Sequence, residues 1–77
     1  MTTFQKLESL VTENFDYTRE GDALIVEYDR WTVKYENHRG QVIMSTYFDN
    51  MIDGIQCYFD GYDAYSQLFN IFYDDEI

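Results

Sequence analysis

Apolar residues in the first part of the chain recur with the spacing of an α-helix. They lie three or four positions apart, or side by side, and they are Phe4, Leu7, Leu10 and Val11. This spacing places them on one side of a helix. Thr2 and Gln5 stand three residues apart at its start, in the pattern of a capping box. The sequence therefore predicts a short N-terminal helix that ends at residues 12–14.

The middle of the chain alternates between apolar and polar residues, as half-buried strands do. The parity of this alternation changes between Tyr28 and Trp31. A shift of one residue exchanges the two faces of a strand, so we expect a tight turn or a bulge at 29–30. Two further turns are predicted at 20–22 and 37–40, where glycine occurs among polar residues. The expected strands are a short one at 15–18 and longer ones at about 23–28, 31–36 and 41–48.

The last third of the chain shows helical spacing again. We expect a helix at about 51–59, capped by Asp49 or Asn50 and ended at 60–61 by a glycine. Its apolar face would consist of Met51, Ile52, Ile55, Tyr58 and Phe59. A final helix is expected at about 62–73, followed by an acidic tail at 74–77 that frays. The residues that this last helix would direct inward are Tyr65, Leu68, Phe69 and Phe72.

The order of these elements predicts an α+β fold. It consists of an N-terminal helix, a three- to four-stranded antiparallel sheet and two C-terminal helices. Helices on one face of a small meander sheet bury the apolar sides of both layers. The chain has 77 residues, which is enough for one hydrophobic core. We therefore expect residues 1–77 to form a single domain.

Charge is distributed unevenly along the chain. Fifteen acidic residues face five basic ones, and the formal net charge is −10. Every Lys and Arg lies at or before Arg39, whereas seven acids follow it. This balance disfavours direct binding to nucleic acid or to an anionic membrane, and it favours encounter with a basic protein. The alternative, that the acids only keep the protein in solution, stays open.

Acidic residues follow one edge of the helix predicted at 51–59. Asp49, Asp53, Gln56 and Asp60 are separated by four, three and four positions, the spacing of one helix side. Acids four residues apart lie about 6 Å apart along a helix axis, and the phosphates of one DNA strand lie about 3.4 Å apart. Such a row could enter an Arg/Lys groove made for phosphates, or it could be only a solvated helix face. The candidate partner-binding residues are Asp49, Asp53, Asp60, Tyr62, Asp63, Asp74, Asp75 and Glu76.

Residues that usually carry catalysis or bind metals are scarce. His38, the single histidine, falls in the predicted hairpin loop at 37–40. Cys57 has acidic and aromatic neighbours and no adjacent base, so its thiolate is not favoured. The stretch 49–54 contains Asp and Gly without the spacing of a calcium-binding loop. We therefore expect no enzyme activity, no catalytic or metal-binding residue, no cofactor and no small-molecule ligand.

The first residues and the cysteine content bear on where the protein works. The N-terminus lacks the basic region and the long apolar run of a signal peptide. No stretch approaches the roughly 20 apolar residues of a membrane span. One cysteine cannot form an internal disulfide. A cytoplasmic protein is therefore expected.

In size, charge and order of elements, the chain resembles the small acidic anti-CRISPR proteins of phages that act as DNA mimics. It is similar to an acidic inhibitor of the type II CRISPR nuclease built from a helix, three strands and two helices. The resemblance implies that Asp and Glu side chains block the DNA-reading groove of a basic nuclease or effector in the host cytoplasm. The competing hypothesis is an acidic interaction module, such as an antitoxin, an immunity protein or an assembly subunit. Surface tyrosines would then bind the partner.

Overall fold

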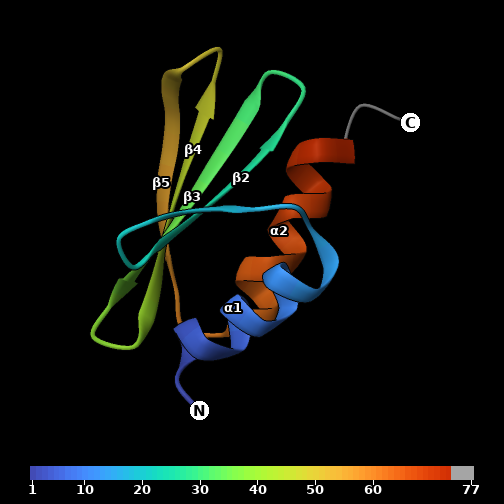
Figure 1. Cartoon of the computed structure of the whole chain (residues 1–77). Coiled ribbons are helices and arrows are strands. Elements are labelled where there is room, and N and C mark those ends of the chain that lie inside the picture. Colours follow the sequence, from blue (N-terminus) through green and yellow to red (C-terminus); the bar gives the residue numbers. More distant parts are fainter. Residues whose placement is uncertain (74–77) are drawn as a thin grey trace.

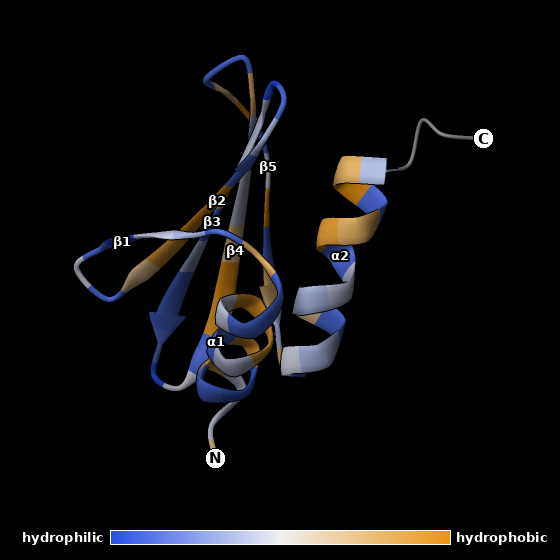
Figure 2. Ribbon diagram, turned by 45° about the vertical axis from the view of Figure 1, so that its right-hand side comes forward, coloured by the Kyte–Doolittle hydropathy of each residue, from blue (hydrophilic) through white to orange (hydrophobic). Residues whose placement is uncertain are grey.

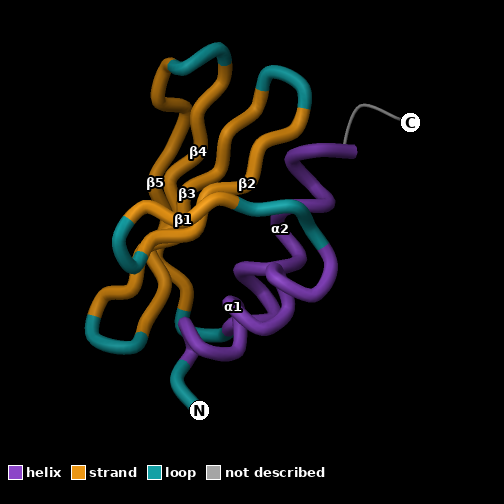
Figure 3. Tube along the Cα trace, in the orientation of Figure 1, coloured by secondary structure: helices purple, strands orange, loops and turns teal. Residues whose placement is uncertain are grey.

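Five antiparallel strands form one sheet, and strands that follow one another in the sequence lie side by side in it (Figure 1). The computed structural model describes residues 1–73. The strands, in their order across the sheet, are β1 (Thr18–Glu20), β2 (Ala23–Tyr28), β3 (Trp31–His38), β4 (Gln41–Phe48) and β5 (Met51–Tyr58). The helices are α1 (Thr3–Asn14) and α2 (Gly61–Tyr73). Both helices lie on the same face of the sheet, and no helix of the described residues lies on the other face (Figure 3).

Two-residue turns connect the longer strands. Arg39 and Gly40, between β3 and β4, have φ values of 55° and 87°. Asp49 and Asn50, between β4 and β5, have φ values of 53° and 66°. Positive φ at both central residues is the requirement of a type I′ turn, which matches the twist of the strands that it joins. Each of these turns therefore directs the chain straight back into the sheet.

Residues of one parity on the central strands form the core together with the helices. Side chains alternate between the two faces of a strand, so each strand directs every second residue toward α1 and α2. Figure 2 shows hydrophobic segments in the central strands and in both helices. The sheet residues in this core cluster are Leu24, Val26, Val33, Tyr35, Val42 and Met44. The buried residues of the helices are Phe4, Leu7, Val11, Ala64, Tyr65, Leu68 and Phe72.

The predicted capping box at the start of α1 is confirmed. The Thr2 hydroxyl accepts from the Gln5 backbone N–H at 3.1 Å, and the Gln5 side-chain oxygen accepts from the Thr2 N–H at 2.9 Å. The start of α1 is also bound to the sheet, because the Phe4 N–H donates to the Gly40 carbonyl at 2.8 Å. The Thr3 hydroxyl donates to the Phe59 carbonyl at 3.0 Å. The start of α1 thus joins the β3–β4 turn to the segment between β5 and α2.

The two helices are in backbone contact at Gly61, the first residue of α2. A Cβ atom at this position would lie 2.7 Å from the Thr3 carbonyl oxygen and 2.9 Å from the Leu7 nitrogen. Both of these atoms belong to the backbone of α1, which cannot move aside as a flexible side chain can. The close approach of α1 and α2 therefore requires glycine at position 61.

A buried hydrogen bond connects the sheet to α2. Tyr35 on β3 is fully buried, and its hydroxyl donates to the Ala64 carbonyl at 2.8 Å. Burial of the side chain, and then the neighbouring Tyr58 phenolate, raises the pKa of Tyr35 above the usual value of a tyrosine. The hydroxyl therefore stays protonated to a higher pH than the hydroxyl of an exposed tyrosine.

The α+β class is confirmed, but the predicted helix at 51–59 is wrong. This segment is β5, which pairs with β4, so the sheet has five strands and one helix follows it. Asp49 and Asn50, predicted as helix caps, form the turn between β4 and β5. Their left-handed conformation, which Asp and Asn adopt more readily than other non-glycine residues, reverses the chain where a helix was expected to begin. The apolar residues whose spacing imitated a helix are exposed instead, and Ile55 has 65% of its surface accessible.

Other boundaries agree more closely with the prediction. The strands predicted at 23–28, 31–36 and 41–48 are β2, β3 and β4, and the last predicted helix is α2. The strand predicted at 15–18 is wrong in position, because β1 begins only at Thr18. Phe15 packs instead against the α2 rings of Tyr65 and Phe72. Phe69, predicted to point inward, is 43% exposed.

Among residues 1–73, neither helix is long and apolar enough to cross a membrane.

Replacing Gly61 by alanine should destabilise the protein by about 1–3 kcal/mol, because the new methyl group overlaps the backbone of α1. Chemical denaturation measures the change in the free energy of unfolding. The matched control is Gly54→Ala in β5, where a Cβ atom would meet only the Thr46 hydroxyl at 3.7 Å. That variant should be as stable as the unaltered protein or more so, since glycine weakens a strand. Equal losses in both variants would contradict the close contact at Gly61.

Alkaline unfolding should depend on Tyr35. Its pKa is raised in the folded state, so above about pH 10 the unfolded chain loses this proton while the folded chain keeps it. The free energy of unfolding should therefore fall by up to about 1.4 kcal/mol per pH unit above pH 10. The variant Tyr35→Phe lacks this contribution, and its stability should fall less steeply over the same range. Denaturation curves at pH 8 to 11 measure both slopes, and parallel slopes would show that Tyr35 ionises equally in both states.

Candidate protein-binding surface

The structure separates the acids that the sequence analysis placed on one helix. Asp49 lies in the β4–β5 turn and Asp53 lies within β5. Asp60 immediately precedes α2, and Tyr62 and Asp63 lie in its first turn. The eight residues of β5 span roughly 25 Å at the rise of a strand, so Asp49 and Asp60 are at opposite ends of this strand. Asp74, Asp75 and Glu76 lie outside the described residues.

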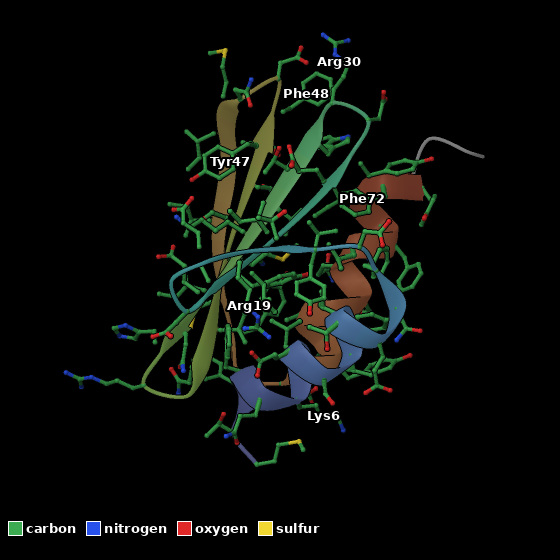
Figure 4. All side chains as sticks on the ribbon, viewed as in Figure 1. Lys6, Arg19, Arg30, Tyr47, Phe48 and Phe72 are labelled. Atoms are coloured by element: carbon green, nitrogen blue, oxygen red, sulfur yellow. The ribbon has the colours of Figure 1, made fainter. Side chains whose placement is uncertain are left out.

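Asp49 is engaged in an ion pair with Arg30. Both side-chain oxygens of Asp49 accept from the guanidinium, the first from Nε at 2.6 Å and the second from an Nη group. The Asp49 N–H also donates to the Arg30 carbonyl at 2.9 Å. These hydrogen bonds from Arg30 lower the pKa of Asp49. Arg30 lies over the Phe48 ring at one end of the sheet (Figure 4), so Asp49 stabilises the contact between two turns.

Asp60 has a structural role at the start of α2. One of its carboxylate oxygens accepts from the backbone N–H groups of Tyr62 at 2.8 Å and of Asp63 at 3.3 Å. A side chain that accepts from these first N–H groups caps a helix. Asp63 adds a second negative charge to the first turn, where the helix dipole favours it. The side chain of Tyr62 is exposed.

The basic residues are largely neutralised by neighbouring acids. Arg19 on β1 donates to Glu8 at 2.7 Å, and Lys34 on β3 donates to Glu20 at 3.2 Å. The hydrogen bond that each base donates to its acid is the main cause that raises the pKa of that base. With Arg30 bound to Asp49, three of the five bases are paired. Within residues 1–73, Asp53, Asp60 and Asp63 have no ion pair, and Lys6 of α1 lies beside Asp60 at a small pocket.

Exposed acids and exposed apolar residues both occur along the edge strand β5, where Ile52 and Ile55 lie on the helix-free face, and at the first turn of α2. We call this edge and first turn the β5–α2 surface. Its exposed acids are Asp53, Asp60 and Asp63, and its exposed large apolar residues are Ile52, Ile55, Phe59 and Tyr62. Phe59 has 73% of its surface accessible. Single exposed apolar residues are common, but a group of them marks an interaction site.

A groove lies between β5 and α2 on the helix-covered face of the sheet. Its volume is about 250 Å³. On β5 it is bordered by Asp53, Gly54 and Gln56, and on α2 by Gln67 and Ile71. Gly54 has no side chain to fill it. The groove is therefore open next to Asp53 and next to β5, the strand at the edge of the sheet.

A second exposed surface consists of aromatic rings. Tyr62, Phe69 and Tyr73 on α2 and Tyr28 on β2 are exposed, and ring contacts connect them through buried neighbours. The Phe69 ring centroid lies 6.0 Å from Tyr73, and Tyr28 lies 5.3 Å from Tyr73. We call this group the aromatic ridge. Eight tyrosines in so short a chain predict that some are exposed, but the helical pattern alone does not indicate which ones.

The residues considered for catalysis and metal binding do not gather in the described part of the chain. His38 is exposed at the end of β3, and Cys57 is exposed on β5. Within residues 1–73, no group of three or more His, Cys, Asp or Glu residues could hold a metal ion. On the helix-free face of the sheet, a shallow hollow beside Lys34 and Tyr47 has a volume of about 290 Å³. In Figure 4, Tyr47 points away from the helices, whereas Phe72 lies between α2 and the sheet.

The sequence analysis missed the apolar part of the β5–α2 surface because it assigned Ile52, Ile55 and Phe59 to a helix core. One available signal was the pair Asp49-Asn50 directly after a strand, since Asp and Asn tolerate the left-handed turn conformation. The other was the pair of isoleucines, since β-branched residues favour strands.

Comparison with protein-family models, with curated protein sequences and with solved structures found no match to this chain.

Proposed function

We propose that this protein is an acidic interaction module that binds a basic protein through the β5–α2 surface. The observation that carries the proposal is the composition of that surface. It presents Asp53, Asp60 and Asp63 beside exposed apolar side chains, and no Lys or Arg follows Arg39 in the sequence. Charge of one sign accelerates the encounter with an oppositely charged partner, and apolar and aromatic side chains supply most of the binding energy at an interface.

The acids of this surface differ in how freely they can meet a partner. Asp53 is exposed and has no ion pair or side-chain hydrogen bond within the described residues. The Asp63 side chain is exposed in the first turn of α2. Asp60 uses one oxygen to cap α2, and Asp49 is held by Arg30. We therefore assign the main electrostatic contacts to Asp53 and Asp63.

A basic partner that normally binds nucleic acid fits this surface, and inhibition by DNA mimicry is the more specific form of the proposal. The resemblance to acidic anti-CRISPR proteins in size and charge is consistent with it, but the order of elements no longer contributes, because five strands and one helix follow α1. A row of acids on a helix no longer supports mimicry, because residues 51–58 form a strand. What supports it is that seven acids and no Lys or Arg follow Arg39 in the sequence. In this form the protein binds no nucleic acid itself and acts in the cytoplasm of a host cell.

The aromatic ridge favours a second candidate function, that of an antitoxin, an immunity protein or an assembly subunit. Tyrosine is enriched among the residues that dominate binding energy at interfaces. Tyr62, which is 57% exposed, belongs to both the ridge and the β5–α2 surface. A partner that covers the ridge would use the acids only at the rim of the interface.

Reversing the charge of two exposed acids tests the proposal. The variant Asp53→Lys with Asp63→Lys should lower the affinity for a partner purified from host lysate by more than about tenfold, since like charges at an interface cost several kcal/mol. Asp60 is left unchanged because its carboxylate caps α2. Surface plasmon resonance at several salt concentrations measures the association rate and the affinity. The association rate of the unaltered protein should fall as salt rises.

The matched control is Glu13→Lys with Asp22→Lys, which changes the net charge equally. Glu13 lies near the end of α1, and Asp22 lies in the turn between β1 and β2. Both positions are exposed and away from β5. The control should lose much less affinity than the test variant. Equal losses would mean that only net charge matters and that the β5–α2 surface is no binding site.

Competition with duplex DNA separates mimicry from the second candidate function. A mimic occupies the groove that binds the phosphate backbone, so rising concentrations of duplex DNA should displace it from the partner. Fluorescence anisotropy of the labelled protein in complex with its partner measures this displacement. A complex that binds DNA and this protein at the same time would contradict mimicry and would favour an interface at the aromatic ridge.

A further inference from the structure

The two edges of the sheet differ in how they are protected. β1, at one edge, has three residues, and its Arg19 and Glu20 form ion pairs with Glu8 and Lys34. Short strands and charged side chains are the usual protection of a sheet edge. β5, at the other edge, has eight residues and contains no Lys, Arg or Pro. An edge strand of this length offers backbone N–H and C=O groups to an additional strand.

A bulge divides β5 into two parts. Thr46 pairs with Gly54 and Tyr47 pairs with Ile52, so Asp53 is an extra residue between them. The regular ladder then continues without interruption from Gly54 to Tyr58. Five residues are close to the mean length of a strand. The part of the edge that can accept another strand is therefore Gly54–Tyr58.

The side chains along Gly54–Tyr58 differ on the two faces of the sheet. Ile55 and Cys57 pair with Ser45 and Ile43 on the helix-free face, and both are exposed. Gly54 is on the face toward α2, where the groove of about 250 Å³ lies open beside Asp53. An added strand would direct alternate side chains to these two faces. One set would contact Ile55 and Cys57, and the other would reach the groove.

The negative charge beside Gly54–Tyr58 favours a basic segment over a second copy of this chain as the added strand. Asp53 borders the groove and Asp60 follows the end of β5, and neither acid has an ion pair within residues 1–73. A second copy of this chain, paired edge to edge, would bring the same acids toward each other. An extended segment with Lys or Arg at alternate positions would neutralise them. The long aliphatic stem of such a side chain suits a groove whose acid lies at its border.

We propose that Gly54–Tyr58 binds an extended basic segment of the partner as a sixth strand of the sheet. A Lys or Arg side chain of this segment enters the groove at Gly54 and meets Asp53. Apolar side chains at the alternate positions pack on Ile55 and Cys57. Main-chain hydrogen bonds supply affinity, and the alternating side chains supply specificity. This inference rests on the proposed binding of a basic protein, and it specifies how that partner binds.

The test uses the full chain and a synthetic eight-residue peptide in which Lys alternates with Val. Isothermal titration measures its affinity for the protein, and amide hydrogen exchange locates the binding site. Two further peptides carry N-methyl groups on one or the other alternating set of amides, with the same charge. Methylation of the set that faces β5 should abolish binding, and methylation of the other set should not. Exchange should slow at amides of Gly54–Tyr58 and not on the exposed side of α2.

The variant Gly54→Val narrows the groove, and its Cβ atom would meet only the Thr46 hydroxyl at 3.7 Å. It should keep or raise the melting temperature, because Val favours strands, and bind the peptide at least about tenfold more weakly, as a blocked pocket requires. The matched control is Thr18→Val on β1, an exposed position at the opposite edge. The control should bind the peptide with unchanged affinity.

Each of the remaining outcomes would overturn the inference. One is equal binding of both N-methylated peptides, and another is full affinity of Gly54→Val. A third is a dimer of the protein alone by analytical ultracentrifugation with β5 amides already protected, which would assign the edge to a second copy. No binding of the parent peptide would also reject this site. The charge reversal at Asp53 and Asp63 uses the natural partner, so it still tests the proposed function if only the strand-addition mode fails.

Discussion

The contact between α1 and α2 at Gly61 determines which parts of the sheet are covered. Because a Cβ atom would lie 2.7 Å from the Thr3 carbonyl, only glycine lets the two helix backbones approach so closely. Drawn together in this way, the helices bury the alternate residues of β2, β3 and β4, and the Tyr35 hydroxyl holds α2 over β3. The helix layer buries little of β5, of which only Tyr58 is partly buried. The close packing of the helices thus leaves one long strand available at the edge.

Much of this fold could be predicted from the sequence, because local chemistry and burial agree over most of the chain. Thr2 and Gln5 form the predicted capping box, and alternating residues locate β2, β3 and β4 within two residues of their ends. The prediction of a helix at 51–58 failed because the spacing of apolar residues indicates an element only where those residues are buried. Almost no side chain of β5 is buried. Its apolar residues are spaced by chance as on a helix, and no buried face was present to correct that pattern. The tolerance of Asp49 and Asn50 for the left-handed conformation and the β-branched side chains of Ile52 and Ile55 distinguish the two structures.

The wrong helix at 51–59 also limited how much of the candidate site could be predicted from the sequence. The sequence analysis found the acids, because charge needs no knowledge of structure, but their roles depend on three-dimensional neighbours. Asp49 appeared equivalent to Asp53, yet Arg30, 19 positions earlier, reaches it across two turns. Asp60 was assigned to the end of one helix and in fact caps the start of the next. Gly54 was expected within a helix and instead opens a groove. These differences in the roles of Asp49, Asp60 and Gly54 arise because residues 51–58 form a strand after the β4–β5 turn and not a helix.

Negative charge has two consequences for an exposed edge strand. Sheet edges without Lys, Pro or a cover tend to pair with other edges, and β5 has an apolar side as well. Two copies that met at β5 would combine a formal charge of −10 each, with Asp53 and Asp60 close to the contact. The repulsion opposes self-association without any basic or proline residue on the edge. A basic segment encounters the opposite field and is attracted. Replacing these acids by lysines would also oppose the pairing of two copies at β5. Lysines would, however, repel a basic partner. Acids at this edge therefore oppose self-association and still allow a basic segment to bind.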